Sequence, residues 1–315
     1  MNEHPNVVSL FSGAGGLDLG FKQAGFNLIW ANDFDMDAVE SYRRNIGDHI
    51  ICGDLSQIPS GDIPSCDVLI GGFPCQGFSL ANTKRSIEDS RNQLYLQYLR
   101  VLKDKKPLVF IAENVRGILS LGHGEVIKTI VSDFETVGYN VRYRLLNAAD
   151  YGVPQTRRRV IIVGTRLDLP STYKYPEPTH SKDGSQGLEP WVSIRTAIEH
   201  LPDPDGPESS TVANNVYSHY KVAPRNYTGH RPTDPNKPSP TILARGNGGG
   251  GVCAIPHYNG IRRLTVRESA TVQTFPSDFY FYGKLNSCYR QVGNAVPVLF
   301  AKVIADSVLN YLRNE

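Results

Sequence analysis

The stretch GGFPCQGFS, residues 71–79, places Cys75 directly behind a proline, on a turn flanked by glycines that follows the short apolar run CDVLI. Most free cysteines are buried and behave as small hydrophobic side chains. A thiol on such a turn instead indicates a reactive group presented to a substrate, since the nucleophilic form of cysteine is an accessible thiolate. The other four cysteines have no comparable context and are assigned to packing: Cys52, Cys66, Cys253 and Cys288.

A second stretch with chemical potential is SLFSGAGGLDLGF, which places Gly13, Gly15 and Gly16 where an apolar run turns into a helical pattern. Glycines at such a point let the backbone approach a ligand closely, and a helix N-terminus favours negative charge. Asp18 occupies the position of the third glycine in the GxGxxG fingerprint, so a nicotinamide dinucleotide is disfavoured as the ligand.

Two acidic residues follow at the ends of the next two apolar runs. Asp33 comes about twenty residues after the glycines, where a carboxylate can accept from ribose hydroxyls. Asp54 could accept from an adenine amino group. Each acid could instead cap the helix that follows it. Taken with the glycine loop, the pair favours an adenosine-containing ligand without a pyrophosphate, such as S-adenosylmethionine.

Alternating elements must position these residues. Six apolar runs predict buried strands at residues 6–11, 27–32, 49–54, 67–72, 107–114 and 159–165. Apolar residues at helical spacing predict helices at 16–25, 36–46, 92–104, 124–138, 265–275 and 298–312. Strand–helix alternation predicts an α/β fold with a doubly wound, mostly parallel sheet covered by helices on both faces.

The pattern changes after residue 166, because twelve of the 21 prolines lie between residues 170 and 240. This composition predicts irregular structure, followed by two short strands around the glycine-rich loop within residues 240–255. We expect one domain formed by residues 1–166 and 295–315, and a smaller domain formed by residues 167–294.

The overall composition restricts the remaining classes. Of the five cysteines none forms a CxxC pair, which argues against a disulfide framework and against a zinc site, so no metal is expected. The chain has neither a signal-peptide pattern nor an apolar run long enough to cross a bilayer, so we expect a cytoplasmic protein without a membrane partner. The net charge of +2 is small, but arginines cluster at 157–159 and at 262–267.

Six motifs in order carry a resemblance to a known family. SLFSGAGG, GGFPCQGFS, AENV, QTRRR, RRLTVRESATVQTFP and QVGNAVP together resemble the DNA (cytosine-5)-methyltransferase family of bacterial restriction-modification systems. The resemblance covers about residues 1–166 and 260–315. It implies a Rossmann-like S-adenosylmethionine-dependent methyltransferase fold, and methyl transfer from S-adenosylmethionine to carbon 5 of a cytosine flipped out of double-stranded DNA.

The resemblance assigns catalytic roles to four residues. Cys75 matches the nucleophile that adds to carbon 6 of cytosine, because carbon 5 alone is too weak a nucleophile to accept a methyl group. Glu113 matches the glutamate that binds N3 and the exocyclic amine. Arg159 and Arg157 match the arginines of the pocket, one at the carbonyl of the base and one near the cysteine.

The resemblance also extends the cofactor site and indicates DNA contacts. The implied cofactor-binding residues are Phe11, Gly13, Gly15, Gly16, Asp33, Asp54, Pro74, Leu94, Asn294 and Val296. Residues 167–294 match the target-recognition domain, where Thr241 would contact the phosphate of the flipped nucleotide. The other implied DNA-binding residues are Ser79 and Arg91 in a loop that closes over the base, and Arg245, Gly246 and Asn247 in the glycine-rich loop. Solvated loop charge is the alternative for each of these residues.

Alternatives of two further kinds stay open. An enzyme of the same fold could methylate cytosine in tRNA, although the long insert with its glycine loop favours a reader of duplex DNA. A non-catalytic DNA-binding protein would have no need of Cys75, Glu113, Arg157 and Arg159. We expect the protein to be a monomer. A cognate restriction endonuclease could belong to the same system, but we do not expect the two proteins to bind each other. The target sequence and the group that removes the C5 proton are not assigned.

Overall fold

A seven-stranded sheet forms the centre of the computed structural model, which describes residues 3–73, 93–169, 172–219, 222, 233–244 and 255–314. The strand order is β3-β2-β1-β4-β5-β7-β6. Neighbours from β3 to β5 are parallel, and β7 is antiparallel to both β5 and β6. The strands are β1 (Asn6–Leu10), β2 (Asn27–Asp33), β3 (Ile50–Cys52), β4 (Val68–Gly71), β5 (Val109–Val115), β6 (Tyr139–Asn147) and β7 (Arg158–Arg166).

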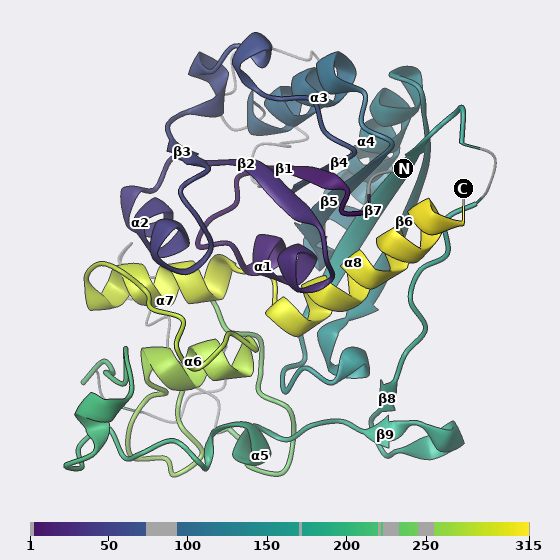
Figure 1. The fold of residues 1–315 in the computed structure, drawn as a ribbon. Coiled ribbons are helices and arrows are strands. Elements are labelled where there is room, and N and C mark those ends of the chain that lie inside the picture. The colour runs from purple at the N-terminus through teal and green to yellow at the C-terminus, as the bar shows by residue number, and fades with distance from the viewer. Residues whose placement is uncertain are drawn as a thin grey trace.

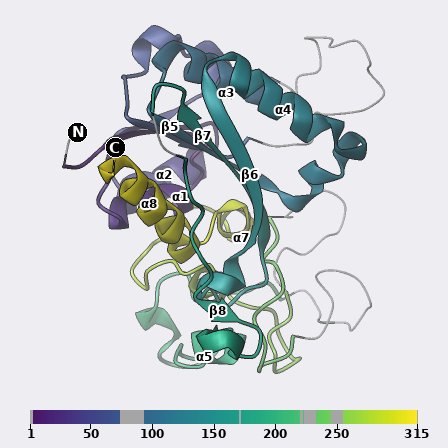
Figure 2. The ribbon, with the colours of Figure 1, turned by 90° about the vertical axis from the view of Figure 1, so that its right-hand side faces the viewer.

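Helices cover both faces of this sheet (Figures 1 and 2). One face packs on α1 (Gly16–Gln23), α2 (Met36–Asn45) and α8 (Val298–Arg313), and the other on α3 (Gln93–Lys105) and α4 (Glu125–Thr136). In β5, Val109 and Ile111 enter the first core while Phe110 and Ala112 enter the second, as the twofold periodicity of a strand requires. The predicted doubly wound, mostly parallel fold is therefore confirmed.

The C-terminal helix returns to the first helix. A Cβ atom at Gly20 of α1 would lie 2.4 Å from Cβ of Ala301 in α8, so the two helices can pack this closely only because residue 20 is glycine. The stretch Leu285–Arg313 is apolar and long enough to resemble a membrane span. It comprises two helices, α7 (Leu285–Asn294) and α8, and 67% of its most apolar window is buried in the protein.

The sequence patterns missed the strand β6. They predicted a short strand where residues 241–244 are coil. All six predicted strands of the sheet are present, as β1 to β5 and β7.

Below the sheet in Figure 1 lies a region of mostly irregular structure. Its elements are β8 (His180–Ser181), β9 (Glu189–Pro190), α5 (Ile194–Ile198), α6 (Val266–Val272) and α7 (Leu285–Asn294). Short 3-10 turns occur at Leu55–Gln57, Ser60–Asp62, Arg116–Leu119, Leu121–Gly124, Ala148–Tyr151, Ser185–Gly187 and Ser209–Thr211.

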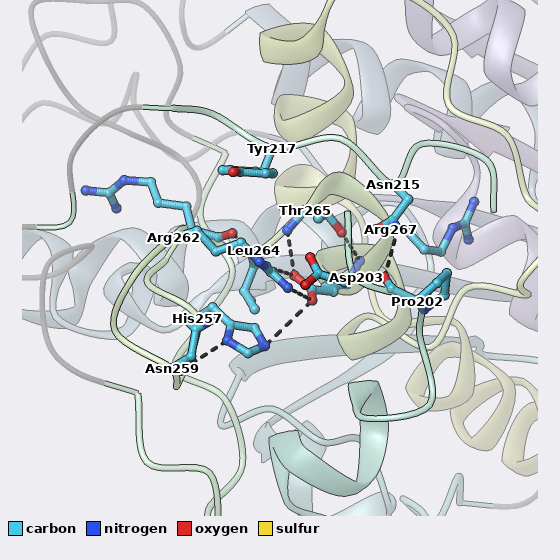
Figure 3. Close-up of polar contacts among 12 residues, drawn as sticks. Pro202, Asp203, Asn215, Tyr217, His257, Asn259, Arg262, Leu264, Thr265 and Arg267 are labelled. Carbon is cyan, nitrogen blue, oxygen red and sulfur yellow. Dashed lines mark hydrogen bonds and ion pairs between the residues drawn. The ribbon is translucent and has the colours of Figure 1, made fainter. Parts of the chain in front are cut away.

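A buried polar cluster around α6 helps to hold this irregular region together (Figure 3). Thr265 and Glu268 form a capping box at the start of α6. The guanidinium of Arg262 donates to both carboxylate oxygens of Glu268, at 2.7 and 2.8 Å, and His257 Nε2 lies 3.7 Å from the same carboxylate. Arg267 donates to the carbonyl oxygens of Ala213, Pro276 and Phe279. These polar contacts add to the apolar packing of the region, in which Leu264, Val266 and Phe281 are fully buried.

Candidate active site

Glu113 and Arg159 form the centre of the candidate site. Glu113 lies near the end of β5 and Arg159 near the start of β7, and the register pairs Val115 with Arg159. The two side chains are therefore two positions apart on one face of the sheet. Arg159 Nε lies 2.7 Å from Glu113 Oε1, and the side chains are only 12% and 13% exposed. The contact is a close ion pair between two largely shielded side chains, and Arg159 Nη1 donates to the carbonyl oxygen of Arg158 at 3.0 Å.

The chain that leads to Cys75 passes beside this pair. A Cβ atom at Gly72 would lie 3.1 Å from Glu113 Oε2, so glycine leaves space for the carboxyl group. Asn114 donates its side-chain N–H to the carbonyl oxygen of Phe73 at 2.8 Å. The turn after β4 is thus attached to the end of β5, two residues before Cys75.

Arg157 occupies a different environment from Arg159. It is 1% exposed, and its guanidinium donates to the carbonyl oxygens of Ile242 at 3.0 Å and Gly293 at 2.9 Å. Its Nε has no hydrogen-bond partner among the described residues. Burial lowers the pKa of this guanidinium, with a further decrease from Arg159. The Arg157 side chain joins three segments and is enclosed by them.

The glycine loop between β1 and α1 has a left-handed backbone at Phe11, Gly13 and Gly15, with φ of 56°, 56° and 87°. A Cβ atom at Gly15 would lie 2.2 Å from Ile46 Cδ1, and one at Gly16 would lie 2.4 Å from the carbonyl oxygen of Val296. No described heavy atom lies within 4 Å of a Cβ placed on Gly13, apart from its chain neighbours. Packing therefore explains Gly15 and Gly16, while Gly13 leaves backbone that a ligand can approach.

Asp33 braces this loop. Its Oδ2 accepts from the backbone N–H of Gly13 at 2.7 Å, and its Oδ1 accepts from that of Asp35 at 2.9 Å. Burial raises the pKa of Asp33, and these backbone donors oppose the shift. Asp35 caps α2, so Asp33 does not have the capping role that was its alternative.

Asp54 does cap the helical turn that follows it, because its Oδ1 accepts from the N–H of Ser56 at 2.9 Å. In the protein without ligand, the exposed Asp54 side chain therefore acts as a helix cap, as the capping alternative predicted. A cap uses one carboxylate oxygen and is compatible with a second acceptor role.

Phe34 is a candidate cofactor-site residue that the sequence patterns did not identify. Its ring is 72% exposed directly after Asp33, where β2 ends, and Met36 beside it is 77% exposed. An exposed aromatic ring at the carboxyl end of a parallel strand is well placed to contact a flat ring of a ligand. The signal available in the sequence was an aromatic residue following an acid at the end of a strand.

The remaining predicted site residues are distributed as follows. Leu94 is half-buried at the start of α3, Asn294 is exposed at the end of α7, and Val296 is buried against Gly16. Thr241 is half-buried and donates its hydroxyl to the carbonyl oxygen of Thr156 at 2.8 Å. Seven predicted site residues lie outside the described residues: Pro74, Cys75, Ser79, Arg91, Arg245, Gly246 and Asn247.

The described residues bring Glu113 and Arg159 together, and they bring the glycine loop together with Asp33 and Val296. No group of three or more His, Cys, Asp or Glu side chains within the described part of the chain is arranged to hold a metal ion.

Comparison with known proteins gives consistent matches over nearly the whole chain. The model of the family described as C-5 cytosine-specific DNA methylase matches residues 5–310. The chain is 42% identical to the Type II methyltransferase M.NgoFVII of Neisseria gonorrhoeae, over 97% of this chain and 86% of that protein. It is 38% identical to the Type II methyltransferase M.BsuRI of Bacillus subtilis, over 98% and 80%.

Solved structures agree with this fold. A DNA modification methyltransferase encoded within a prophage of E. coli matches with a TM-score of 0.75 and 27% identity, over 98% of this chain and 99% of that chain. The S. pombe Dnmt2 methyltransferase matches with a TM-score of 0.70 and 22% identity, over 99% of each chain. At that level of identity the second match bears on the fold alone.

Proposed function

The chain belongs to the C-5 cytosine-specific DNA methylase family and is a DNA (cytosine-5)-methyltransferase, and from this premise we propose that Cys75, Glu113 and Arg159 are its catalytic residues. The observation that carries the proposal is the shielded Glu113–Arg159 pair beside the chain that leads to Cys75. The pair presents a carboxyl group and a guanidinium together, which suits the acceptor and donor groups along one edge of a cytosine ring.

The proposed reaction begins with the Cys75 thiolate. Its sulfur forms a bond to C6 of cytosine, and the electron pair of the C5–C6 double bond moves into the ring toward N3. The Glu113 carboxyl group supplies a proton at N3, and Arg159 donates to the carbonyl oxygen at position 2. Carbon 5 thereby becomes nucleophilic enough to accept a methyl group. As C5 takes the methyl group, the N3 proton returns to Glu113; loss of the C5 proton and departure of the Cys75 thiolate from C6 then restore the aromatic ring.

The family implies S-adenosylmethionine, which supplies the methyl group as an electrophile when bound. Three features of the described residues fit this ligand: the accessible backbone at Gly13, the carboxylate of Asp33 that holds it, and the exposed ring of Phe34. We propose that Phe34 contacts the adenine and that Asp33 fixes the loop. The other proposed cofactor residues are Phe11, Gly15, Gly16, Asp54, Pro74, Leu94, Asn294 and Val296.

DNA is the substrate that the family implies. Cytosine C5 cannot be reached by a thiol inside a stacked duplex, so the target base must be flipped into the site. We propose that Thr241 contacts the phosphate of the flipped nucleotide, together with Ser79, Arg91, Arg245, Gly246 and Asn247 along the strand. Because the relatives are named Type II methyltransferases, we propose a cytoplasmic, monomeric enzyme that protects DNA from a cognate restriction endonuclease.

The proposal is tested by incubating the protein and S-adenosylmethionine with random-sequence duplex DNA and then sequencing the 5-methylcytosine positions. We expect methylation at cytosine within one short sequence. A matched RNA pool distinguishes the alternative substrate. Methylation of RNA with none in DNA would overturn the assignment to duplex DNA.

A further inference from the structure

A continuous buried set of polar side chains connects the DNA-facing segment around Thr241 with the glycine loop of the cofactor site. It consists of Gln155, Arg157 and Gln273, which are 0%, 1% and 0% exposed. The function proposed above accounts for the two ends of this connection but gives its middle no role. We propose that these three side chains are positioning residues through which DNA binding strengthens cofactor binding, an inference that rests on the proposed function.

The first part of the connection holds the DNA-facing segment. Both backbone groups of Ile242, the residue after Thr241, bind buried side chains. The N–H of Ile242 donates to Gln155 Oε1 at 2.8 Å, and its carbonyl oxygen accepts from Arg157 Nη1 at 3.0 Å. The hydroxyl of Thr241 donates to the carbonyl oxygen of Thr156. A movement of Thr241 toward a phosphate must therefore act on residues 155–157.

The second part leads from Gln155 to the end of α7. Gln155 Nε2 donates to Gln273 Oε1 at 2.7 Å. Gln273 Nε2 in turn donates to the carbonyl oxygens of Val292 at 2.7 Å and Ala295 at 3.1 Å. Arg157 makes a parallel connection, because its Nη2 donates to the carbonyl oxygen of Gly293. The turn that follows α7 is thus held from two sides.

The third part is a direct contact with the cofactor loop. The carbonyl oxygen of Val296 lies so close to Gly16 that a Cβ atom there would be 2.4 Å from it. At the opposite end of the same turn, a Cβ atom at Gly293 would lie 2.3 Å from the carbonyl oxygen of Leu243. Close-packed contacts of this kind transmit small displacements because the interior has little free volume.

The chemistry of the three side chains favours a positioning role. Apolar residues could fill this interior, whereas buried amides and a buried guanidinium are costly unless their partners are held in one arrangement. Gln155 has a single amide that accepts from one segment and donates to another, and Gln273 does the same. A change at either end therefore alters hydrogen bonds at the other.

Coupling between two ligands is reciprocal and is measured directly by binding. S-adenosylhomocysteine would be titrated calorimetrically into the wild-type protein, with and without a saturating duplex that carries the site found by methylation sequencing. We expect the duplex to lower the Kd by a factor in the typical range of about 5 to 150. In Gln273→Met this factor should fall close to 1.

Gln291→Met is the matched control. Gln291, on α7, is a buried amide like Gln273. Its Nε2 donates to the carbonyl oxygen of Tyr282 and its Oε1 accepts from Ser41, so its side chain is not part of the connection. The Gln291→Met substitution should lower the stability of the protein about as much as Gln273→Met does. The duplex should still lower the Kd for S-adenosylhomocysteine by the wild-type factor. Arg157→Lys provides a second variant, since one ammonium group cannot replace both guanidinium contacts, and its factor should also fall.

Equal factors in Gln273→Met and Gln291→Met would overturn the inference, and so would a wild-type factor of 1. If Gln273→Met fails to fold, the factor in Arg157→Lys is compared with that in Gln291→Met instead, and equal factors would again overturn the inference. Methyl transfer by the wild-type protein is measured on the same duplex. Failure of the sequencing experiment to find any methylated site would refute the proposed function, whereas methyl transfer on this duplex with a factor of 1 refutes only the coupling.

Discussion

Arg159 on β7 and Glu113 on β5 form a 2.7 Å ion pair across two antiparallel strands of a mostly parallel sheet. The antiparallel insertion of β7 brings the start of one strand beside the end of another. An arginine from residues 157–159 can reach the carboxyl end of β5 only with this topology. The site therefore depends on the direction of β7 as much as on the two residue types.

Glu113→Gln should reduce methyl transfer about a thousandfold, because general acid catalysis at a reacting base typically contributes 10² to 10⁴. The amide keeps the shape of the side chain but cannot supply a proton at N3. Single-turnover transfer of a radiolabelled methyl group measures the effect. Glu40→Gln is the control, since its ion pair with Arg44 lies on the protein surface and exposed pairs of this kind contribute little to stability. Retention of near-wild-type kcat by Glu113→Gln would contradict the acid role.

Cys75→Ser should abolish methyl transfer while leaving the affinity for S-adenosylhomocysteine within about twofold, because Asp33 and the glycine loop do not depend on the thiol. Wild-type protein should also form a covalent complex with duplex DNA containing 5-fluorocytosine, and the variant should not. Denaturing gel electrophoresis shows the complex. Cys66→Ser removes a half-buried thiol that precedes β4, at the opposite end of that strand from Cys75, and should behave as wild type.

The sequence patterns identify most of the sheet because its strands are short apolar runs with turn residues at both ends. They fail for β6, an edge strand whose exposed Arg142, Tyr143 and Arg144 interrupt the apolar pattern. They also fail for α7, which buries polar residues such as Ser287 and Gln291 where an apolar stripe would be expected.

For the site, the patterns indicate which residues carry chemistry but not which atoms meet. Asp33 has two readings from the sequence, ribose binding and helix capping, and the structure shows it bonded to Gly13 N. Arg157 and Arg159 belong to one motif, yet Arg157 is enclosed by chain segments that are 85 and 136 residues away. Long-range contacts of this kind have no local signature.

Phe34→Ala should weaken binding of S-adenosylmethionine about tenfold and leave stability within about 0.5 kcal/mol. The ring is 72% exposed, so its removal costs little in folding, whereas stacking on a base is worth about 1 to 3 kcal/mol. Equilibrium dialysis measures the affinity, and urea unfolding measures the stability. Met36→Ala, at a neighbouring position of similar exposure, should change the affinity less than twofold. Equal effects of the two substitutions would refute the ring contact.

Asp18, at the start of α1, makes the stability of the protein depend on pH. Burial raises its pKa from 3.8 to about 7, although the hydrogen bond from Tyr42 opposes the shift. Between these two values the folded protein holds the proton and the unfolded chain does not. The free energy of unfolding should therefore fall by about 1.4 kcal/mol for each pH unit from about pH 5 to pH 7, and this decrease should level off near pH 8.

Asp18→Asn removes this titration while preserving most of the shape. Relative to wild type, its free energy of unfolding should rise by about 1.4 kcal/mol per pH unit between pH 5 and pH 7 and level off near pH 8. Urea unfolding at pH 5, 6, 7 and 8 measures the difference. Tyr42→Phe deletes the hydroxyl that donates to Asp18 Oδ1 at 3.0 Å, which should raise the pKa of Asp18 further and move the upper end of the window to higher pH. A difference between Asp18→Asn and wild type that stays constant across the four pH values would contradict a proton held on Asp18.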